Sequence, residues 1–591
     1  MADAAIARAP AGRVRPGQPV PVSYPSLPAL LFQQARQRAD RPMLRYWRDG
    51  AWQRLRWAAF AHGAAAVAAW LRAQGVMPGD RVLIVSESRP EFPIADTAIM
   101  AIGAVTVPTY TTNTVADHAH ILRDSGARVA VVSTPALARK VAEAAAQAEG
   151  LDLLLGMDPP PGLPGIRTHG WAEAVATPCD GAALEQETHR IAPGQLACLV
   201  YTSGTGGAPR GVMLPHRAML ANREGVARIT EQLHLEGEAY LSFLPLSHAY
   251  EHTVGFLLPT LGVEVVYSRG ADRLASEFRE IRPAIVTAVP RVFELLRGRL
   301  LAQREKLSPI RRTLFDRAVT LGLRRMDGPK LGPLARIEDA VLDRLVRRAV
   351  RERFGGRLVA MVSGGARLDP DLAGFFLALG LPVLQGYGQT EAGPVVSVNP
   401  PWDIRRETVG PPLEGVTVRI APDGELLLRG DLVMDGYWGQ PGATAAALRP
   451  SEDDPDGPVW LHTGDVGTIE DGYIRITDRK RDIIKTLGGD MVSPARLEGL
   501  LMAEPEIAQA VVAGDGQAGI SALLVPAEDM AEKVEATVQR VNRRLSGIER
   551  IRHWAVVPPF TLEEGLLTPT QKVKRRAVLA HHAATLEALR R

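Results

Sequence analysis

The chain contains 591 residues, enough for several domains of ordinary size and at least one large hydrophobic core. Hydrophobic residues make up 46% and charged residues 23%, as in ordinary globular proteins, and a net charge of only +3 does not indicate a nucleic-acid partner. The two cysteines, Cys179 and Cys198, are too few for a disulfide framework and lack metal-ligand spacing, which favours the reducing cytoplasm.

The sequence carries no pattern typical of export or of a membrane span. Its first residues contain Arg and Pro where a secretory signal has an unbroken apolar core, so we expect no export. The apolar run GFLLPTLGVEVVY is shorter than the roughly 18 residues of a spanning helix and is interrupted by Pro259 and Glu264. We therefore expect any membrane contact to be peripheral.

The first regular part of the chain alternates between buried strands and helices. Continuous apolar runs predict strands at 81–88, 104–110 and 128–133, and the stretches between them predict helices at 91–103 and 114–126. Short apolar strands separated by helices indicate a parallel sheet that is covered on both faces.

The same alternation returns later in the chain. Apolar runs predict further strands at 240–245, 263–268, 284–290 and 357–365, with helices between them. We therefore expect two stacked, mostly parallel sheets that pack as one large α/β unit.

After this body, the pattern changes to paired strands. The stretches 416–430 and 466–478 surround Asp-Gly dipeptides, which predict β-hairpins and a small barrel-like element. A charged segment at 477–485 precedes about a hundred residues with helix and strand signals. We therefore expect an N-terminal domain of residues 1–478 and a small α+β C-terminal domain of residues 479–591.

The stretch LVYTSGTGGAPRGVMLPH (199–216) places a loop of Thr, Ser and Gly before Arg210. Bare backbone N–H groups, hydroxyl donors and a guanidinium suit a polyphosphate. Pro209 stands where a Walker loop needs its second glycine, and it also breaks a G-x-G-x-x-G reading. A phosphate loop here therefore belongs to another class.

Three further stretches supply the other parts of a nucleotide site. In LQGYGQTEAGP, Tyr387 offers a flat face for a base, Thr390 a hydroxyl and Glu391 a hard oxygen for Mg²⁺. In LHTGDVG, Asp465 could accept two ribose hydroxyls, and LLTPTQKVKRR presents Lys572. Each stretch alone is also typical of a turn, a helix cap or a solvated tail. The four together predict a site for ATP with Mg²⁺.

Seven motifs, in this order, resemble those of the adenylate-forming (AMP-binding) acid ligases: YTSGTGGAPRGVMLPH, LPLSHAYEH, VSGGARLDP, GYGQTEAGP, LHTGD, TDRKRDIIKTLGGDMVSPARLE and LLTPTQKVKRR. The resemblance spans about residues 25–580. The forms GYGQTE, VPRVFE and LTPTQKVKR are similar to those of the long-chain fatty acid–CoA ligase (acyl-CoA synthetase) branch.

The resemblance implies which residues contact ATP. The β- and γ-phosphates would be held by Thr202, Ser203, Gly204, Thr205, Gly206, Gly207 and Arg210. Adenine would lie against Gly364, Gly365, Ala366, Tyr387 and Gly388. The remaining contacts would be made by Thr390 to the α-phosphate, by Glu391 to Mg²⁺, and by Asp465 and Arg479 to the ribose.

The resemblance also implies the catalytic and moving parts. Lys572 would be the catalytic lysine of the C-terminal domain, which would rotate as a lid about Arg481. His248 would stand where the acyl group or the thiol enters. Gly488 and Gly489 would approach the pantetheine arm of coenzyme A, because glycine permits close contact.

Two positions depart from the family's usual phosphate loop. Gly206 replaces a Thr or Ser, and Arg210 replaces a Lys. A hydroxyl donor is lost, whereas Arg can still hold phosphate through its planar fork. We expect ATP binding to survive with an altered geometry.

The resemblance implies a cytoplasmic enzyme that joins a medium- or long-chain fatty acid to coenzyme A through an acyl-adenylate, releasing AMP and pyrophosphate. Two alternatives stay open: a fatty acyl-AMP ligase that loads a carrier protein, and a catalytically weak sensor that binds nucleotide and lipid. The sequence also leaves open the acyl chain length and the oligomeric state.

The span 296–354 is rich in arginine and has two interpretations. As a basic amphipathic segment it could lie on an anionic membrane surface. Alternatively, its helices pack on the body and its arginines are solvated or pair with Glu305, Asp316, Asp339 and Asp343, which is the slightly favoured interpretation. The apolar residues on which the first interpretation depends are Leu300, Leu301, Leu307, Leu314, Leu321, Leu323, Leu342 and Leu345.

Overall fold

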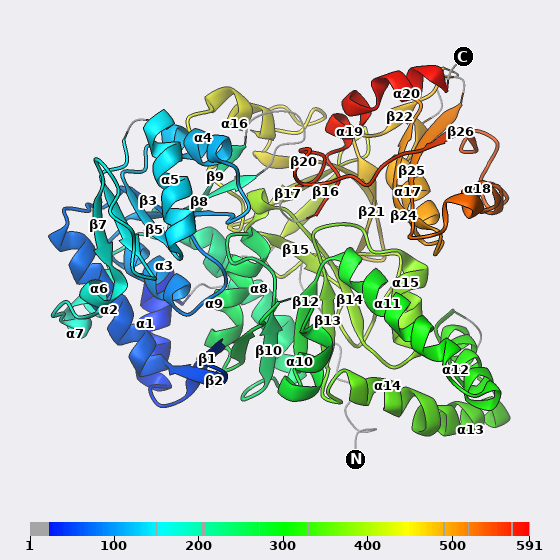
Figure 1. Cartoon of the computed structure of the whole chain (residues 1–591), viewed down its shortest axis with the longest axis horizontal. Helices are drawn as coiled ribbons and strands as arrows, with labels where there is room; N and C mark the ends of the chain where they lie inside the picture. Colours follow the sequence, from blue (N-terminus) through cyan, green and yellow to red (C-terminus); the bar gives the residue numbers. More distant parts are fainter. Residues whose placement is uncertain are drawn as a thin grey trace.

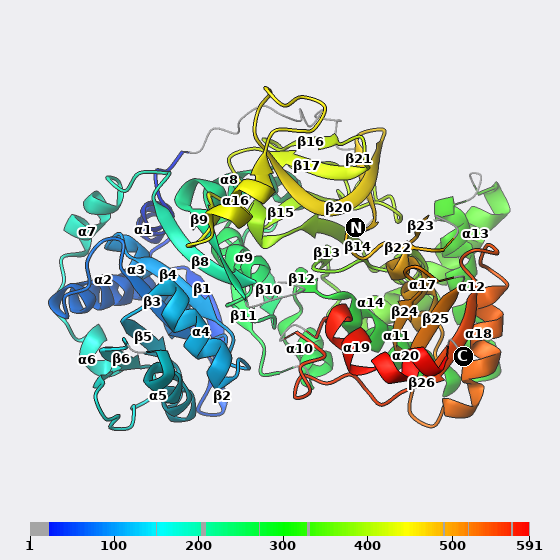
Figure 2. The ribbon, with the colours of Figure 1, turned by 90° about the horizontal axis from the view of Figure 1, so that it is seen from above.

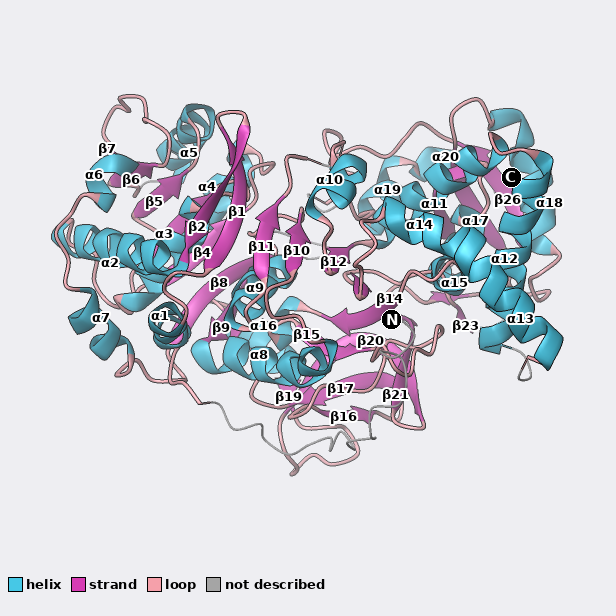
Figure 3. Cartoon of the chain, turned by 90° about the horizontal axis from the view of Figure 1, so that it is seen from below, coloured by secondary structure: helices cyan, strands magenta, loops and turns pink. Residues whose placement is uncertain are grey.

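Two eight-stranded, mostly parallel sheets form the body of the computed structural model (Figure 3). Both contain the short apolar strands that the sequence predicts, so the expected α/β class with two packed sheets is confirmed. The structure describes residues 23–148, 150–202, 209–270, 272–327, 331–487, 491–517, 519–568 and 571–589.

The first sheet contains the strands expected at 81–88, 104–110 and 128–133 as β3, β4 and β5. Strands β8 to β7 of this sheet run parallel, and β9 and β18 add an antiparallel edge. Its spatial order is β18 (Gly436–Tyr437), β9 (Arg210–Pro215), β8 (Leu196–Thr202), β4 (Val105–Thr109), β3 (Arg81–Val85), β5 (Val129–Val132), β6 (Leu153–Gly156) and β7 (Arg167–Gly170).

Local hydrogen bonds set the ends of α4 (Val115–Ser125), which the sequence predicts at 114–126. The Thr114 hydroxyl accepts from the Asp117 N–H at 3.1 Å, and the Asp117 carboxylate accepts from the Thr114 N–H at 2.9 Å. This reciprocal pair satisfies two of the N–H groups that a helix start leaves free. Gly126 ends the helix with a φ of 65°, which glycine adopts without steric cost.

The second sheet is parallel from β14 to β1, and β15 and β2 are its antiparallel edges. Its order is β15 (Val395–Val398), β14 (Val383–Gly388), β13 (Ala360–Ser363), β12 (Ile285–Ala288), β10 (Ala239–Ser242), β11 (Glu264–Tyr267), β1 (Pro42–Arg48) and β2 (Ala51–Arg56). The loops after β12, β13 and β14 therefore leave the sheet at the same edge, where α/β proteins bind ligands.

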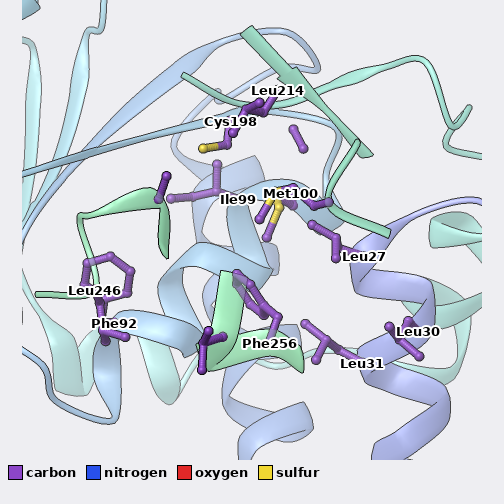
Figure 4. Packing of buried hydrophobic residues seen from close by; sticks show 14 of the residues in the cluster. Leu27, Leu30, Leu31, Phe92, Ile99, Met100, Cys198, Leu214, Leu246 and Phe256 are labelled. Carbon is purple, nitrogen blue, oxygen red and sulfur yellow. The ribbon is translucent and has the colours of Figure 1, made fainter. Parts of the chain in front are cut away.

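The largest core lies between the two sheets. It joins apolar residues of both sheets to several helices, among them α1 (Leu27–Gln37), α2 (Trp57–Ala73), α3 (Glu91–Ala101), α8 (His216–Thr230) and α9 (Ala249–Thr260). Figure 4 shows Leu27, Phe92, Ile99 and Phe256 around this core, together with the buried thiol of Cys198. Both cysteines are free thiols, and Cys179 is partly exposed.

Other helices cover the outer faces of the sheets. The first sheet packs against α4 and α5 (Pro135–Ala148), whereas α6 (Trp171–Val175) packs on α2 and α7 (Gly181–Thr188) packs on α1. The second sheet packs against α10 (Leu274–Ile281), α11 (Pro290–Glu305), α12 (Pro309–Asp327) and α15 (Pro370–Ala378). The chain extends this layer outward through α13 (Pro333–Leu342), a π-helical turn (Asp343–Arg347) and α14 (Arg348–Arg353).

A smaller antiparallel sheet follows the α/β body and lies above it in Figure 2. The hairpins expected at 416–430 and 466–478 are present in it as β16–β17 and β20–β21. Its strands are β16 (Thr417–Ile420), β17 (Glu425–Arg429), β19 (Leu448–Arg449), β20 (Trp460–Glu470) and β21 (Tyr473–Arg479), and α16 (Pro441–Ala447) packs beside it.

The last hundred residues form a separate α+β layer with its own core, at the upper right of Figure 1. Its strands are β22 (Ile484–Lys485), β23 (Met491–Val492), β24 (Ile507–Ala513), β25 (Ile520–Pro526) and β26 (Ile551–Val556). Its helices are α17 (Pro494–Met502), α18 (Val534–Asn542), α19 (Arg575–His581) and α20 (Ala583–Ala588). Among the residues that the structure describes, none of the helices is long and apolar enough to cross a bilayer.

The outer helices α12, α13 and α15 are held together by one fully buried guanidinium, that of Arg347. It donates to the carbonyl oxygens of Ala378 at 2.7 Å and Ala318 at 3.0 Å, and it lies 2.7 Å from the carboxylate of Asp339. A buried charge is tolerated only when it is paired and hydrogen-bonded, as this one is.

We therefore expect Arg347→Met to lower the free energy of unfolding by on the order of 3 kcal/mol, because it leaves Asp339 with only its ion pair to Arg325 and removes the donor of two buried carbonyls. The matched control is Arg348→Met, which removes an exposed ion pair with Glu352 and should cost about 0.5 kcal/mol or less. Urea unfolding of both variants makes the comparison. Equal losses would show that the buried contacts do not stabilise this layer.

Candidate active site

A cavity of about 1270 Å³ lies where the α/β body, the small antiparallel sheet and the C-terminal layer meet. Its lining includes residues just beyond the ends of β12, β13 and β14, namely Val289, Gly364 and Gln389. Residues 571–576 of the C-terminal layer line it from the other side. The volume exceeds the roughly 300–1000 Å³ of sites for one drug-sized ligand, so the cavity has room for two substrates.

The residues expected at adenine and ribose converge on one carboxylate. The Tyr387 hydroxyl donates to Asp465 Oδ2 at 2.6 Å, and Arg479 Nε lies 3.4 Å from Asp465 Oδ1. Asp465 and Arg479 are register partners across β20 and β21, so the sheet fixes their proximity. Burial raises the pKa of Asp465, and Arg479 and the Tyr387 hydroxyl oppose that rise.

Two glycines in the expected adenine wall allow close approach. A Cβ at Gly388 would lie 1.9 Å from the Pro394 carbonyl oxygen, so no side chain fits there. Gly365 has a φ of 81°, which an L side chain rarely adopts. Gly364 is buried, whereas Gly365 and Ala366 are exposed to the cavity that all three line.

Lys572 reaches from the C-terminal layer into the cavity of the N-terminal body. Its Nζ lies 3.4 Å from the position that a Cβ at Gly365 would take. The segment is turned by two hydrogen bonds between Thr568 and Lys572, at 2.8 Å and 3.0 Å. Burial, with repulsion from Arg479, lowers the pKa of the Lys572 ammonium to about 8.

The phosphate loop is described only at its two ends. Thr202 closes β8 and Arg210 opens β9, where they are register partners, and both line the cavity. The residues between them that the sequence singles out lie outside the described residues: Ser203, Gly204, Thr205, Gly206 and Gly207. Gly488 and Gly489, expected at coenzyme A, also lie outside them.

Glu391 lies near the Arg210 end of the phosphate loop, in a short 3-10 turn that also contains Thr390. Its Oε1 accepts a hydrogen bond from the Tyr437 hydroxyl at 2.9 Å, and the Arg210 guanidinium lies over the Tyr437 ring at 5.5 Å. No group of three His, Cys, Asp or Glu side chains able to hold a metal occurs among the described residues. A single carboxylate fits Mg²⁺, which takes its other ligands from phosphates and water.

Apolar side chains of α8 and α9 line part of the cavity. Val226, Ile229 and Leu233 line it from α8 and the turn that follows, and Val254 and Leu257 line it from α9. On each side the spacing is that of one helix face. These side chains have the chemistry of an alkyl-chain site, whereas Asp465, Arg479 and Lys572 give the same cavity polar and charged lining.

His248 stands at the first turn of α9, where it is the helix cap and lines the cavity. Its Nδ1 accepts from the Tyr250 N–H at 3.2 Å, so the neutral ring carries its proton on Nε2. Burial, with repulsion from Lys572, lowers the pKa of His248 to about 3. The ring therefore offers a neutral donor at neutral pH.

Arg481 also lines the cavity, and burial with repulsion from Arg479 lowers the pKa of its guanidinium. The preceding residue is clamped to the small antiparallel sheet. Lys480 forms ion pairs with Asp423 and, at 3.1 Å, with Glu425. Arg481, the expected pivot, therefore directly follows a residue that two ion pairs hold to this sheet.

Sequence reasoning missed two residues that line the cavity, Tyr250 and Tyr437, and the buried Glu251 beside it. The Tyr250 ring contacts Gly364, where an added Cβ would lie 3.3 Å from it. Glu251 is fully buried and accepts hydrogen bonds from the hydroxyls of Tyr240, Ser242 and Thr287. Burial raises the pKa of the Glu251 carboxyl to about 7. The motif LPLSHAYEH contains both Tyr250 and Glu251 and is the sequence signal that could have identified them.

The chain matches two families described as "AMP-binding enzyme", over residues 31–438, and "AMP-binding enzyme C-terminal domain", over residues 481–591. It is 34% identical to the long-chain-fatty-acid–CoA ligase FadD15 of Mycobacterium tuberculosis, with 96% of this chain and 97% of the relative covered. It is 28% identical to human long-chain-fatty-acid–CoA ligase 6, with 86% and 78% covered.

Solved structures show the same fold. The A domain of carboxylic acid reductase from Segniliparus rugosus, in complex with AMP and a co-purified carboxylic acid, superposes with a TM-score of 0.72. The sequence identity is 20%, and 95% of this chain and 94% of that chain are covered. ATP-bound MatB from Rhodopseudomonas palustris gives a TM-score of 0.70 at 22% identity, with 94% and 99% covered.

The buried carboxyl of Glu251 should make stability depend on pH. The folded protein keeps the Glu251 proton up to about pH 7, whereas an unfolded glutamate loses it near 4.5. Stability should therefore fall as pH rises through this window, by on the order of 3 kcal/mol from this group. We expect Glu251→Gln to remove this part of the slope.

Thermal unfolding at a series of pH values measures the effect, and Glu532→Gln, at an exposed position, is the control. An unchanged slope in Glu251→Gln would show that the carboxyl is already ionised in the folded protein.

Proposed function

The chain belongs to the AMP-binding enzyme family, and on that premise we propose that it joins a medium- or long-chain fatty acid to coenzyme A at the expense of ATP. The observation that carries this proposal is the lining of one cavity, which combines Tyr387, Asp465 and Lys572 with an apolar set of side chains from α8 and α9. One cavity therefore offers contacts both to a nucleotide and to an alkyl chain.

In the first step, a carboxylate oxygen of the fatty acid attacks the α-phosphorus of ATP, and the bond to pyrophosphate breaks. Negative charge gathers on the phosphoryl oxygens and the leaving group, so catalysis consists mainly of positioning and charge neutralisation. Lys572 supplies a cation, and Thr390 a hydroxyl for the α-phosphate. Tyr387 and the glycine wall hold adenine, while Asp465 and Arg479 hold the ribose.

Mg²⁺ held by Glu391 would add positive charge beside the phosphates. Arg210 faces the same end of the cavity and replaces the usual lysine with a planar fork. His248, as a neutral donor on Nε2, suits an oxygen of the acyl group.

In the second step, the thiol sulfur of coenzyme A attacks the acyl carbon, and AMP leaves. The lysine that serves the first step occupies the cavity, so we propose that residues 479–591 rotate about Arg481 to withdraw it. Lys572 belongs to the C-terminal layer, and its ammonium lies beside Gly365 of the N-terminal body, so a rotation of that layer would move it out of the cavity. Gly488 and Gly489 would then face the pantetheine arm.

We further propose that the enzyme works in the cytoplasm and contacts anionic membranes peripherally, since its acid substrate partitions into lipid. The two other candidate functions, a carrier-loading acyl-AMP ligase and a nucleotide- and lipid-binding sensor, have no observation in their favour. Curated relatives that span nearly the whole chain or most of it are named as CoA ligases, which favours coenzyme A over a carrier protein as acceptor and turnover over sensing.

A panel of acids from acetate to oleate tests the function, with ATP, Mg²⁺ and free coenzyme A supplied. We expect acyl-CoA and AMP in equal amounts, with the highest kcat/KM for medium or long chains. Formation of acyl-adenylate without thioester would indicate the carrier-loading alternative. No acid-dependent release of pyrophosphate would indicate the sensor.

Lys572→Ala tests the division of labour between the two steps. We expect fatty-acid-dependent pyrophosphate release to fall by on the order of 10² to 10³, because a charge that neutralises the transition state is lost. Thioester formation from preformed acyl-adenylate should be largely kept. Lys533→Ala, at an exposed position in the same layer, is the control. Equal losses in both half-reactions would contradict the moving lid.

A further inference from the structure

A row of exposed apolar side chains follows one face of α13 and the π-helical turn after it. Leu334 is 84% exposed, Ile337 64%, Val341 49% and Leu345 61%. Their spacing of three, four and four residues places them on a single helix face. The opposite face, with Leu342 and Val346, is buried in the outer core. We call the exposed row, with Arg344 and Arg348 at its end, the α13 face.

This row shares only Leu345 with the apolar set that the sequence indicated. Leu300, Leu321 and Leu342 of that set are buried, so α11 and α12 pack on the body as scaffold. Many arginines of the span pair with acids, as the favoured interpretation expected. Examples are Arg304 with Asp316, Arg325 with Asp339 and Arg351 with Asp343. The α13 face is what this packing leaves exposed.

The segment that carries the α13 face is strongly basic. Residues 309–353 contain twelve basic and six acidic residues, a larger positive surplus than the +3 of the whole chain. The three acids of α13 and the following turn are all paired: Glu338 with Arg317, Asp339 with Arg325 and Arg347, and Asp343 with Arg351. Among the described residues, Arg311, Arg324 and Arg344 have no acidic partner.

The α13 face also stands clear of the rest of the molecule. Figures 1, 2 and 3 all place α13 at the rim, beyond α12. The helix that carries most of the row therefore lies at the periphery of the molecule.

We propose that the α13 face docks on the surface of an anionic lipid bilayer. The apolar row would enter the boundary between headgroups and acyl chains, and the arginines would face the lipid phosphates. This inference rests on the proposed function, because a fatty acid substrate is drawn from lipid. A second copy of the chain fits the face less well, since a self-complementary contact would bring two basic surfaces together.

Co-sedimentation of the full chain with vesicles tests the docking. We expect binding to phosphatidylcholine vesicles to rise when phosphatidylglycerol is included and to fall with added salt, which screens the charges. Replacing Leu334, Ile337, Val341 and Leu345 by Ser should lower the partition coefficient by about tenfold or more, because the inserted apolar area is lost. The four side chains are about half or more exposed, so the fold should be unaffected.

Two further variants separate the contributions. Arg311→Gln, Arg324→Gln and Arg344→Gln combined should weaken binding and flatten its salt dependence. Met77→Ser with Val459→Ser removes equally exposed apolar side chains elsewhere and should leave binding unchanged. Equal binding by wild type and the serine variant, or binding that ignores lipid charge and salt, would overturn the proposal. So would a dimer in solution that the serine variant dissociates.

The same variants are assayed without vesicles for thioester formation from a water-soluble medium-chain acid. We expect wild-type rates, because the α13 face is remote from the cavity lining. A wild-type chain that makes no thioester would refute the proposed function, whereas normal turnover with charge-independent vesicle binding would refute only the docking surface.

Discussion

The buried carboxylate of Asp465 is the contact on which the arrangement of the site depends. It accepts a hydrogen bond from the hydroxyl of Tyr387, near the end of β14, and it faces Arg479 at the end of β21. Its charge also attracts the ammonium of Lys572. Three residues that are far apart in sequence therefore interact with one side chain. These contacts bring the polar residues of the cavity lining together.

The lining of the cavity carries more positive than negative side chains, because arginines and lysines outnumber carboxylates there. Repulsion from Arg479 adds to burial in lowering the pKa of both Arg481 and Lys572. Clustered cations are costly without a counter-charge. A polyphosphate supplies that counter-charge, so the unfavourable electrostatics of the empty cavity become favourable when nucleotide binds.

The elements that the sequence predicted well are those with strong local signals. The strands at 81–88 and 128–133 are continuous apolar runs, and α4 begins at a capping box and ends at a glycine. Motif spacing likewise pointed to Tyr387, Asp465 and Lys572, which the fold brings to one cavity. Such signals need no knowledge of distant contacts.

Other features depend on packing that no local pattern encodes. The leucines of α11 and α12 have helical periodicity, yet periodicity does not say which face a neighbouring helix covers, and the exposed row proved to be on α13. Glu251 resembles any polar residue of a helix start until Tyr240 and Thr287 surround it from two strands. Tyr437 reaches Glu391 only because β18 pairs with β9.

The central claim is that the acid is activated as an adenylate before coenzyme A is needed. Exchange of labelled pyrophosphate into ATP measures this directly, with Mg²⁺ and fatty acid present and coenzyme A omitted. We expect exchange that requires the fatty acid and proceeds without the thiol. Exchange without any acid, or none until coenzyme A is added, would contradict it.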